Sequence, residues 1–540
     1  MSGFEIFGVV AAVLPLITTG LPKFMQVLET FRNTNFIKEE SLDNVSSLCT
    51  ELKVTFAILQ QLHSQCPRIP HGHHGIADEF KSLFRGFPKT VKRLRGECEK
   101  LTKKSTIGFI LSLHRLEEAV QELERQIQRL FRRMTLLVTY LQRIVPDASW
   151  AIQYSGGSQA HGRNHRPSHI RELLKAQHSR PRKIGSQARF IDLGRSVGDF
   201  TIQADRYSKS NLVIVETCTF VGLKSVIWGE LASQEVVRKL SINSPADWLG
   251  ILICRAAEWV TQSPRKAELT IIYRYPAMAD PNRAPLTLRS VLRHDDDPDQ
   301  LPRPDMPLRV RLRLAREVSN AVLFVHVAGL VHKDIRPENI LIFFPRHRPG
   351  RSGRTDGMGR AFLTGFGESR DEPDNRRDRK LSGGGMNTGP MTYKTSNWHQ
   401  ILYRHPSRVG SRPARFTMRH DIYALGITLF EIGLWRSFVG SPGSILARPK
   451  DARRAIMYYN THRPLGVFNH EVPESERAIQ STLLVAARQL LPFAMGEMYT
   501  SIVVSCLTCL ERDGGDLVPD EGACAKFIQN VLDRLDDIRI

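Results

Sequence analysis

The sequence predicts a multidomain protein in which an N-terminal all-α helical bundle precedes an α+β domain with two lobes. Apolar residues recur at helical spacing up to about residue 148, short β-rich runs begin near residue 186, and helical patterns dominate beyond residue 307. A chain of 540 residues is also too long for a single hydrophobic core. We therefore expect a bundle at 1–148, a linker at 149–185, a small lobe at 186–280 and a large lobe at 281–540.

Charge and cysteine content limit the partners and the compartment. The formal net charge is +21, but no basic stripe is interleaved with aromatic residues, so we do not expect nucleic acid as a partner. An anionic membrane surface fits better, because a basic linker is combined with an apolar N-terminus. The eight cysteines are spread thinly and favour a reducing compartment, and Cys506 and Cys509 are expected to be buried helical thiols, not a zinc site. We expect a cytoplasmic protein that becomes peripheral to a membrane on activation.

The bundle is expected to contain helices at 42–65, 76–103 and 109–144. In the third helix, apolar residues alternate spacings of four and three, which is a sustained heptad seam. The seam has two interpretations, the spine of an intramolecular bundle or a surface for self-association. We favour the spine, because the two preceding helices need an apolar partner within the domain.

Residues 3–21 at the start of the chain are almost all apolar. They do not resemble a secretory signal, since Glu5 stands where basic residues are expected and no small-residue cleavage site follows. We expect them to form a buried helix of the bundle. No other segment is expected to reach transmembrane length.

The α+β domain is expected to begin with strands and to continue with helices. Strand patterns occupy residues 212–216 and 269–273, and helical patterns occupy residues 307–328 and 420–434. Small strands followed by a larger helical region predict two lobes of unequal size.

The most informative motif is H-x-D-x-R-x-x-N, framed by apolar strands, with its fixed positions at His332, Asp334, Arg336 and Asn339. The motif resembles the catalytic loop of eukaryotic protein kinases, and the resemblance extends over residues 186–535. It implies that the α+β domain has a protein-kinase-like fold.

The kinase resemblance also implies roles for single residues. Asp334 would accept the proton of the attacking hydroxyl, Arg336 would neutralise the transferred phosphoryl group, and Asn339 would be the candidate metal ligand. His332 would pack against the activation segment. Asp421, in a segment that resembles D-x-Y-x-x-G, would accept hydrogen bonds from the backbone of the catalytic loop. A kinase of this kind would use ATP and magnesium.

Three departures from the kinase pattern argue against phosphoryl transfer. Cys218 is expected in place of the strand Lys that contacts nucleotide phosphates, and Gly365 replaces the metal-binding Asp. Ser407 replaces the Glu at the end of the activation segment. Neither a thiol nor a glycine can hold a tetra-anionic nucleotide, so any binding of ATP and magnesium is expected to be weak. Glu368 and Lys224 are the nearby groups that could substitute.

Two features of the small lobe give weaker signals. Gly194 and Gly198 could be a remnant of a glycine-rich loop, but their spacing fits a plain turn better. Glu230 or Glu235 could be the glutamate of the small-lobe helix, although neither would have a Lys partner on the strand.

The start of the chain, MSGFEIFGVV, together with the expected bundle, resembles the HeLo-like domains of fungal prion-inhibition and cell-death proteins. Those domains are cytosolic bundles whose apolar N-terminus can enter membranes when it is released. Residues 332–435 resemble the degenerate kinase domains that accompany HeLo-like domains in filamentous fungi. The two resemblances imply a signalling or cell-death protein.

We therefore predict a pseudokinase domain that senses a regulatory protein partner or a ligand, and a bundle that acts as effector by self-association or membrane binding. Two alternatives stay open. The first is an active atypical Ser/Thr protein kinase that binds ATP and uses Asp334 as its base. The second is a non-catalytic oligomeric scaffold built on the heptad seam.

Overall fold

The computed structural model describes Arg129 and residues 190–205, 208–240, 250–293, 306–345, 358–371, 402–408, 416–438, 476–510 and 521–538. All of these except Arg129 belong to residues 179–540, which form one compact unit. The predicted bundle at 1–148, its heptad seam and the linker at 149–185 lie outside the described residues, apart from Arg129.

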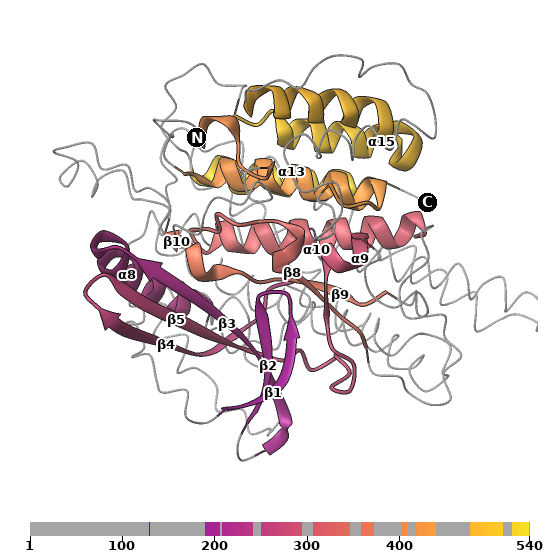
Figure 1. Cartoon of the computed structure of the whole chain (residues 1–540). Coiled ribbons are helices and arrows are strands. Elements are labelled where there is room, and N and C mark those ends of the chain that lie inside the picture. The colour runs from indigo at the N-terminus through magenta and orange to yellow at the C-terminus, as the bar shows by residue number, and fades with distance from the viewer. Residues whose placement is uncertain are drawn as a thin grey trace, which may run out of the picture. The chain divides into compact units, whose positions relative to one another are not determined.

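The small lobe is built on an antiparallel sheet of five strands with the order β1-β2-β3-β5-β4 (Figure 1). Its strands are β1 (Phe190–Val197), β2 (Phe200–Asp205), β3 (Ser208–Val221), β4 (Cys254–Ser263) and β5 (Lys266–Arg274). The strands predicted at 212–216 and 269–273 are confirmed within β3 and β5. The run Val213-Ile214-Val215 is buried on both faces of β3, which suits β-branched side chains in a central strand.

Helix α8 (Leu223–Leu240) follows β3 and packs against the sheet. The rings of Phe220 on β3 and Trp259 on β4 lie 4.9 Å apart. A Cβ atom at Gly229 of α8 would come within 2.7 Å of the Phe220 ring, so the glycine lets the helix approach the sheet closely.

The large lobe is a stack of helices, α10 (Leu308–Val327), α13 (Met418–Leu434), α15 (Glu476–Leu507) and α16 (Glu521–Asp537) (Figure 1). The predicted helices at 307–328 and 420–434 are confirmed as α10 and α13. Helix α10 is buried over most of its length and contacts both α13 and α16. Arg316 on α10 pairs with Asp536 and donates to the carbonyl of Leu535, which fixes the end of α16.

Helix α15 corrects the expectation about membrane-spanning segments. Residues Ile479–Leu507 are long and apolar enough to cross a membrane by length and composition alone. The helix bends at Gly496, whose φ of 81° and ψ of 167° are not helical, and it packs against α13 in the large lobe. Cys506 and Cys509 are both buried, as the sequence predicts, but Cys509 lies in the turn that follows the helix and not in the helix itself.

Short elements in the large lobe present the residues of the predicted catalytic loop. Strand β7 (Leu330–Val331) pairs with β10 (Arg370–Asp371), and β8 (Ile340–Phe343) pairs with β6 (Leu286–Thr287) and β9 (Arg360–Leu363). The remaining elements are the helix α9 (Leu288–Arg293) and the 3-10 turns η3 (Pro337–Asn339), η4 (Phe366–Glu368) and η5 (Pro406–Arg408). The described part of the chain is thus a sheet followed by helices, consistent with a kinase-like lobed fold.

Candidate functional site

The predicted catalytic loop lies between β7 and β8 and is held by α13. Asp421 near the start of α13 is fully buried, and its two carboxylate oxygens accept the backbone N–H groups of His332 and Lys333 at 2.8 Å each. This is the role that the sequence predicts for Asp421. Lys333 has a φ of 73°, a left-handed conformation that is unfavourable for a side chain with a Cβ atom. The large lobe therefore holds the loop in a strained shape.

His332 has a structural position within this loop. Its side chain is fully buried, its Nε2 atom lies 2.9 Å from the carbonyl oxygen of Thr364, and its ring lies 4.7 Å from that of Phe366. Burial lowers the pKa of His332, although the nearby Asp421 acts in the opposite direction. His332 supports the segment that carries Phe366 and is not exposed for proton transfer.

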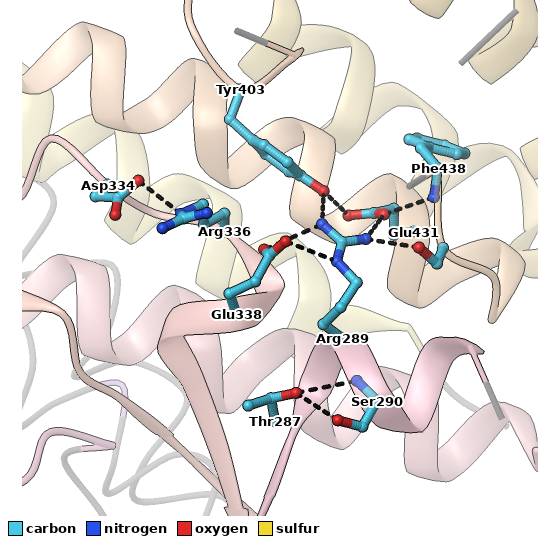
Figure 2. Close-up of polar contacts among 10 residues, drawn as sticks. Thr287, Arg289, Ser290, Asp334, Arg336, Glu338, Tyr403, Glu431 and Phe438 are labelled. Carbon is cyan, nitrogen blue, oxygen red and sulfur yellow. Dashed lines mark hydrogen bonds and ion pairs between the residues drawn. The ribbon is translucent and has the colours of Figure 1, made fainter. Parts of the chain in front are cut away.

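Asp334, Arg336 and Asn339 are brought together and engage one another. Arg336 Nε pairs with Asp334 Oδ1 at 2.8 Å (Figure 2). Asn339 Nδ2 donates to Asp334 Oδ2 at 2.7 Å and to the Asp334 carbonyl oxygen at 2.8 Å. A carboxylate beside a cation is what proton abstraction coupled to phosphoryl transfer requires, so the loop keeps the arrangement of a catalytic loop.

Arg289 lies near this loop, and sequence reasoning gave it no role. Its guanidinium group donates to Glu338 at 3.1 Å through both Nε and Nη2, and to Glu431 at 2.5 Å through Nη1. It also donates to the hydroxyl group of Tyr403 (Figure 2) and to that of Ser437. We call these five residues the Arg289 cluster. The cluster connects α9, the catalytic loop, the segment at 402–408 and α13.

The two carboxyl groups of the Arg289 cluster respond differently to the arginine. Burial acts to raise the pKa of Glu338, but Arg289 and Arg336 outweigh it and lower the pKa to about 2. Burial raises the pKa of Glu431, because it exceeds the opposing effect of Arg289. Glu431 also accepts hydrogen bonds from the Tyr403 hydroxyl at 2.5 Å and the Phe438 N–H at 2.7 Å (Figure 2).

Glu216 on β3 is the second residue that sequence reasoning missed. The residue is only 5% exposed, and its carboxyl group lies against the turn at 365–367. Oε2 accepts the first two N–H groups of this turn at 3.2 Å each and the hydroxyl of Tyr273 at 2.6 Å. Oε1 accepts the third N–H at 2.9 Å and the thiol of Cys218 at 3.4 Å. We call Glu216, Tyr273, Cys218 and residues 365–367 the Glu216 site.

Glu216 and Cys218 lie on the same face of β3, and both reach this turn: Glu216 accepts its N–H groups, and a Cβ atom at Gly367 would collide with the Cys218 Sγ atom. Glu216 lies opposite Ile271 on β5, and Tyr273, two residues further along, presents its side chain on the same face. The Cys218 thiol donates to Glu216. Glu216 is therefore a second residue of β3, beside the predicted Cys218, that could stand at the lysine position of the kinase pattern. Aligning V-A-I-K directly with Val213-Ile214-Val215-Glu216 would have found it.

The sequence predicts that Gly365 stands where kinases carry a metal-binding Asp. Its φ is 82°, and a Cβ atom there would come within 2.6 Å of Asn339 Nδ2 and 2.8 Å of Asn339 Oδ1. A side chain at this position would collide with the other residue expected to bind magnesium. With a carboxyl group at Glu216 and no carboxyl group at Gly365, the residues present do not fit a complex of magnesium with ATP.

The other acidic candidates of the small lobe and the turn have surroundings of their own. Glu230 is exposed on α8, and Glu235 pairs with an arginine of the same helix. Glu368 lies close enough to Lys333 to influence its pKa. The side chain of Lys224 lies outside the described residues.

Ser407 at the end of the predicted activation segment lies between two histidines. Its Oγ atom is 2.9 Å from His405 Nδ1 and 3.2 Å from His420 Nε2. Burial lowers the pKa of His405 to about 4 and is the main cause that lowers the pKa of His420 to about 3. Both rings are therefore neutral near pH 7, and Ser407 joins them by hydrogen bonds where the kinase pattern has a Glu.

Comparisons with known proteins support a kinase-like domain. No protein-family model matches the chain. The chain is similar to eIF-2-alpha kinase GCN2, with 27% identity over 122 residues to the Mus musculus protein and 29% over 126 residues to the Homo sapiens protein. It is 28% identical over 121 residues to serine/threonine-protein kinase PrkC of Bacillus subtilis (strain 168). These matches cover 22% to 23% of the chain and only 7% to 14% of the curated relatives.

Proposed function

We propose that the chain is a signalling protein whose kinase-like domain is a non-catalytic switch. The observation that carries the proposal is the contact between Glu216 and the turn at 365–367. Kinases use a lysine on this strand for the nucleotide phosphates and an aspartate at the start of this turn for magnesium. We assign Glu216 and Gly365 of this chain to these two positions.

The Glu216 carboxyl group opposes nucleotide binding through its charge and its hydrogen bonds. Its oxygens would face phosphate oxygens, so acceptors would meet acceptors where the nucleotide needs cationic donors. Removing a single donor that stabilises a transition state slows a reaction by a factor on the order of a hundred to a thousand. The chain lacks the lysine and the aspartate together, so we expect phosphoryl transfer to be negligible.

The effector role in this proposal belongs to the N-terminal region, residues 1–148. Its support is the apolar start of the chain and its resemblance to HeLo-like domains of cell-death proteins. In the cytoplasmic resting state, a regulatory protein partner or ligand would act on the kinase-like domain. The N-terminal region would then self-associate or bind an anionic membrane surface, aided by the basic linker.

An active Ser/Thr kinase is the second candidate function. It is favoured by the preserved contacts among Asp334, Arg336 and Asn339. The two relatives described above are named as kinases. This candidate requires another group to neutralise the nucleotide phosphates, because Glu216 cannot.

Nucleotide binding by the full chain separates the two candidates. We expect ATP with magnesium to leave the thermal unfolding temperature unchanged, and we expect no phosphate transfer to the chain itself or to a generic protein substrate. Adenosine, which carries no phosphate, and ADP, which carries fewer phosphates than ATP, serve as comparisons. Phosphate transfer that disappears in Asp334→Asn would overturn the switch proposal and establish an active kinase.

Vesicle binding tests the effector role. The full chain should bind vesicles that contain phosphatidylserine, at least after its switch is released, and Ile6→Glu or Val10→Glu should weaken that binding. Ser2→Glu is the matched control, since it adds the same charge beside the apolar run. If the chain does not bind vesicles and sediments as an oligomer, the scaffold interpretation replaces the membrane role.

A further inference from the structure

The Glu216 site connects the small lobe to the large lobe. Glu216 and its partners Tyr273 and Cys218 belong to the sheet, whereas the turn at 365–367 follows β9 of the large lobe. Three backbone N–H groups of that turn point at one carboxyl group. Separating the lobes would break all three bonds at once and would leave a carboxyl group and three donors to find new partners.

The turn between β1 and β2 makes a second contact between the lobes. A Cβ atom at Gly198 would come within 3.1 Å of the Thr287 methyl group, which belongs to β6 of the large lobe. Asp199 is also close enough to act on the Arg336 guanidinium group of the catalytic loop. The turn thus lies over the catalytic loop and would move away with the rest of the small lobe.

Kinases connect these same elements through charged groups. Their strand lysine pairs with a glutamate of the small-lobe helix and with the nucleotide phosphates, so closure is coupled to nucleotide binding. In this chain Glu230 of α8 is exposed, and Glu235 pairs with Arg238 of the same helix. Glu216 reaches the turn at 365–367 directly from β3 and needs neither a helix glutamate nor a nucleotide.

We infer that Glu216 is an interlobe latch, which holds the small lobe closed on the turn at 365–367 with no ligand between the lobes. The inference deepens the proposed function and rests on it in taking the domain to be a switch. Closure is the resting state, and a regulatory partner separates the lobes by moving β3 away from the turn. Tyr273 and Cys218 support the latch, because they donate to the carboxyl group from the small-lobe side.

Hydrogen exchange on the full-length chain tests the latch, with Glu216→Gln and Glu216→Ala as the variants. Glu216→Gln keeps the size of the side chain but brings an amide N–H group against the N–H groups of the turn. Glu230→Gln is the matched control on the exposed face of α8. Exchange is followed at 365–367 and at the remote turn at 196–200, and alkylation of the half-buried Cys218 is mapped by peptide mass spectrometry.

The latch predicts a change that reaches beyond its own hydrogen bonds. In both Glu216 variants, amides at 365–367 and at 196–200 should exchange at least about tenfold faster, and Cys218 should be alkylated faster, while α10 and α13 keep their protection. Faster exchange confined to 365–367 would overturn the latch, because the contact would then be local packing. Loss of protection in α10 and α13 would also overturn it, since Glu216 would then belong to the folding core. Phosphate transfer by the wild-type chain would refute the switch, yet the exchange pattern would still decide whether the latch exists.

Discussion

The Arg289 cluster and the Glu216 site both bury carboxyl groups, but they satisfy them with different donors. Glu338 and Glu431 share the guanidinium group of Arg289. Glu216 accepts its hydrogen bonds from backbone N–H groups, a phenol and a thiol, which are all neutral. One carboxyl group is thus surrounded by dipoles, whereas the other two are paired with a charge.

This difference matches where each group lies. The Arg289 cluster lies within the large lobe, where a buried ion pair is costly to break because either partner alone would be an uncompensated charge. The Glu216 site lies between the lobes. When the lobes separate, its neutral donors can replace their hydrogen bonds to the carboxyl group with hydrogen bonds to water, which costs less free energy than breaking a buried ion pair. A cation therefore suits the fixed part of the domain, and neutral donors suit the part that we propose to open.

Removal of the cation from the Arg289 cluster should have the largest effect. Arg289→Ala leaves Glu338 and Glu431 without their shared counter-charge, and we expect a loss of about 3–5 kcal/mol in the free energy of unfolding. Chemical denaturation of the full chain measures it, with the exposed Arg274→Ala as the control. The loss of stability in Arg289→Lys should lie between those of Arg289→Ala and Arg274→Ala, because an ammonium group keeps the charge but not the forked geometry. A loss no larger than that of Arg274→Ala would mean that the cluster contributes no more than a surface arginine.

Addition of a carboxyl group next to the Glu216 site should have the next largest effect. Gly365→Asp restores the kinase residue but forces a Cβ atom against Asn339 at a φ of 82°. We expect a loss of about 2 kcal/mol or more and no gain in magnesium binding, measured by denaturation with and without the metal. Gly365→Asn has nearly the same shape without the charge and should be less harmful, because it does not add a second carboxyl group near Glu216. Stabilisation of Gly365→Asp by magnesium would show that the site still accepts a metal.

The sequence predicted those parts of the domain that depend on local patterns. The runs within β3 and β5, the helices α10 and α13 and the bond from Asp421 to the catalytic loop all follow from periodicity or from a short motif. Glu216 could not be assigned in this way, since its partners at 365–367 lie about 150 residues further along the chain. Its role depends on the register between β3 and β5. A shift of that register by one residue would have placed the Glu216 side chain on the opposite face of the sheet.

Arg289 escaped prediction for a similar reason. It is one of two arginines in a short helix, and its partners Glu338, Tyr403 and Glu431 lie 49, 114 and 142 residues away. Nothing in the local pattern separates it from the many exposed arginines of this basic chain. The available signals were two carboxylates, Glu338 in the catalytic loop and Glu431 in the apolar helix α13. A buried acid needs a partner, so both indicate a buried cation nearby.

The pH dependence of stability should have opposite signs for Glu338 and Glu216. Arg289 and Arg336 outweigh burial and hold the pKa of Glu338 at about 2, so its contribution is present above the unfolded value of 4.5 and is lost as the pH falls towards 2. Burial raises the pKa of Glu216 above 4.5, so its contribution is largest below 4.5 and is lost as the pH rises through the folded pKa. Each unit of pKa shift corresponds to about 1.4 kcal/mol.

Denaturation across a series of acidic to neutral buffers measures both signs. The stability difference between wild type and Glu338→Gln should shrink on acidification, and the difference between wild type and Glu216→Gln should grow. Parallel profiles for the two variants would contradict the opposite pKa shifts of Glu338 and Glu216.

A pair of buried tyrosines gives the finest test of the comparison. Tyr273 donates to the Glu216 carboxyl group at 2.6 Å, whereas Tyr499 donates to the neutral carbonyl of Leu429 at 2.7 Å, and both side chains are fully buried. Hydrogen bonds to charged groups contribute more than bonds between neutral groups, so Tyr273→Phe should cost about 1 kcal/mol more than Tyr499→Phe above the pKa of Glu216. The excess should vanish when Glu216 is protonated or replaced by Gln, as a double-mutant cycle would show. If Tyr273→Phe still costs about 1 kcal/mol more than Tyr499→Phe in the Glu216→Gln background, the cost comes from ring packing around Tyr273. The Tyr273 hydroxyl would then have no special part in the latch.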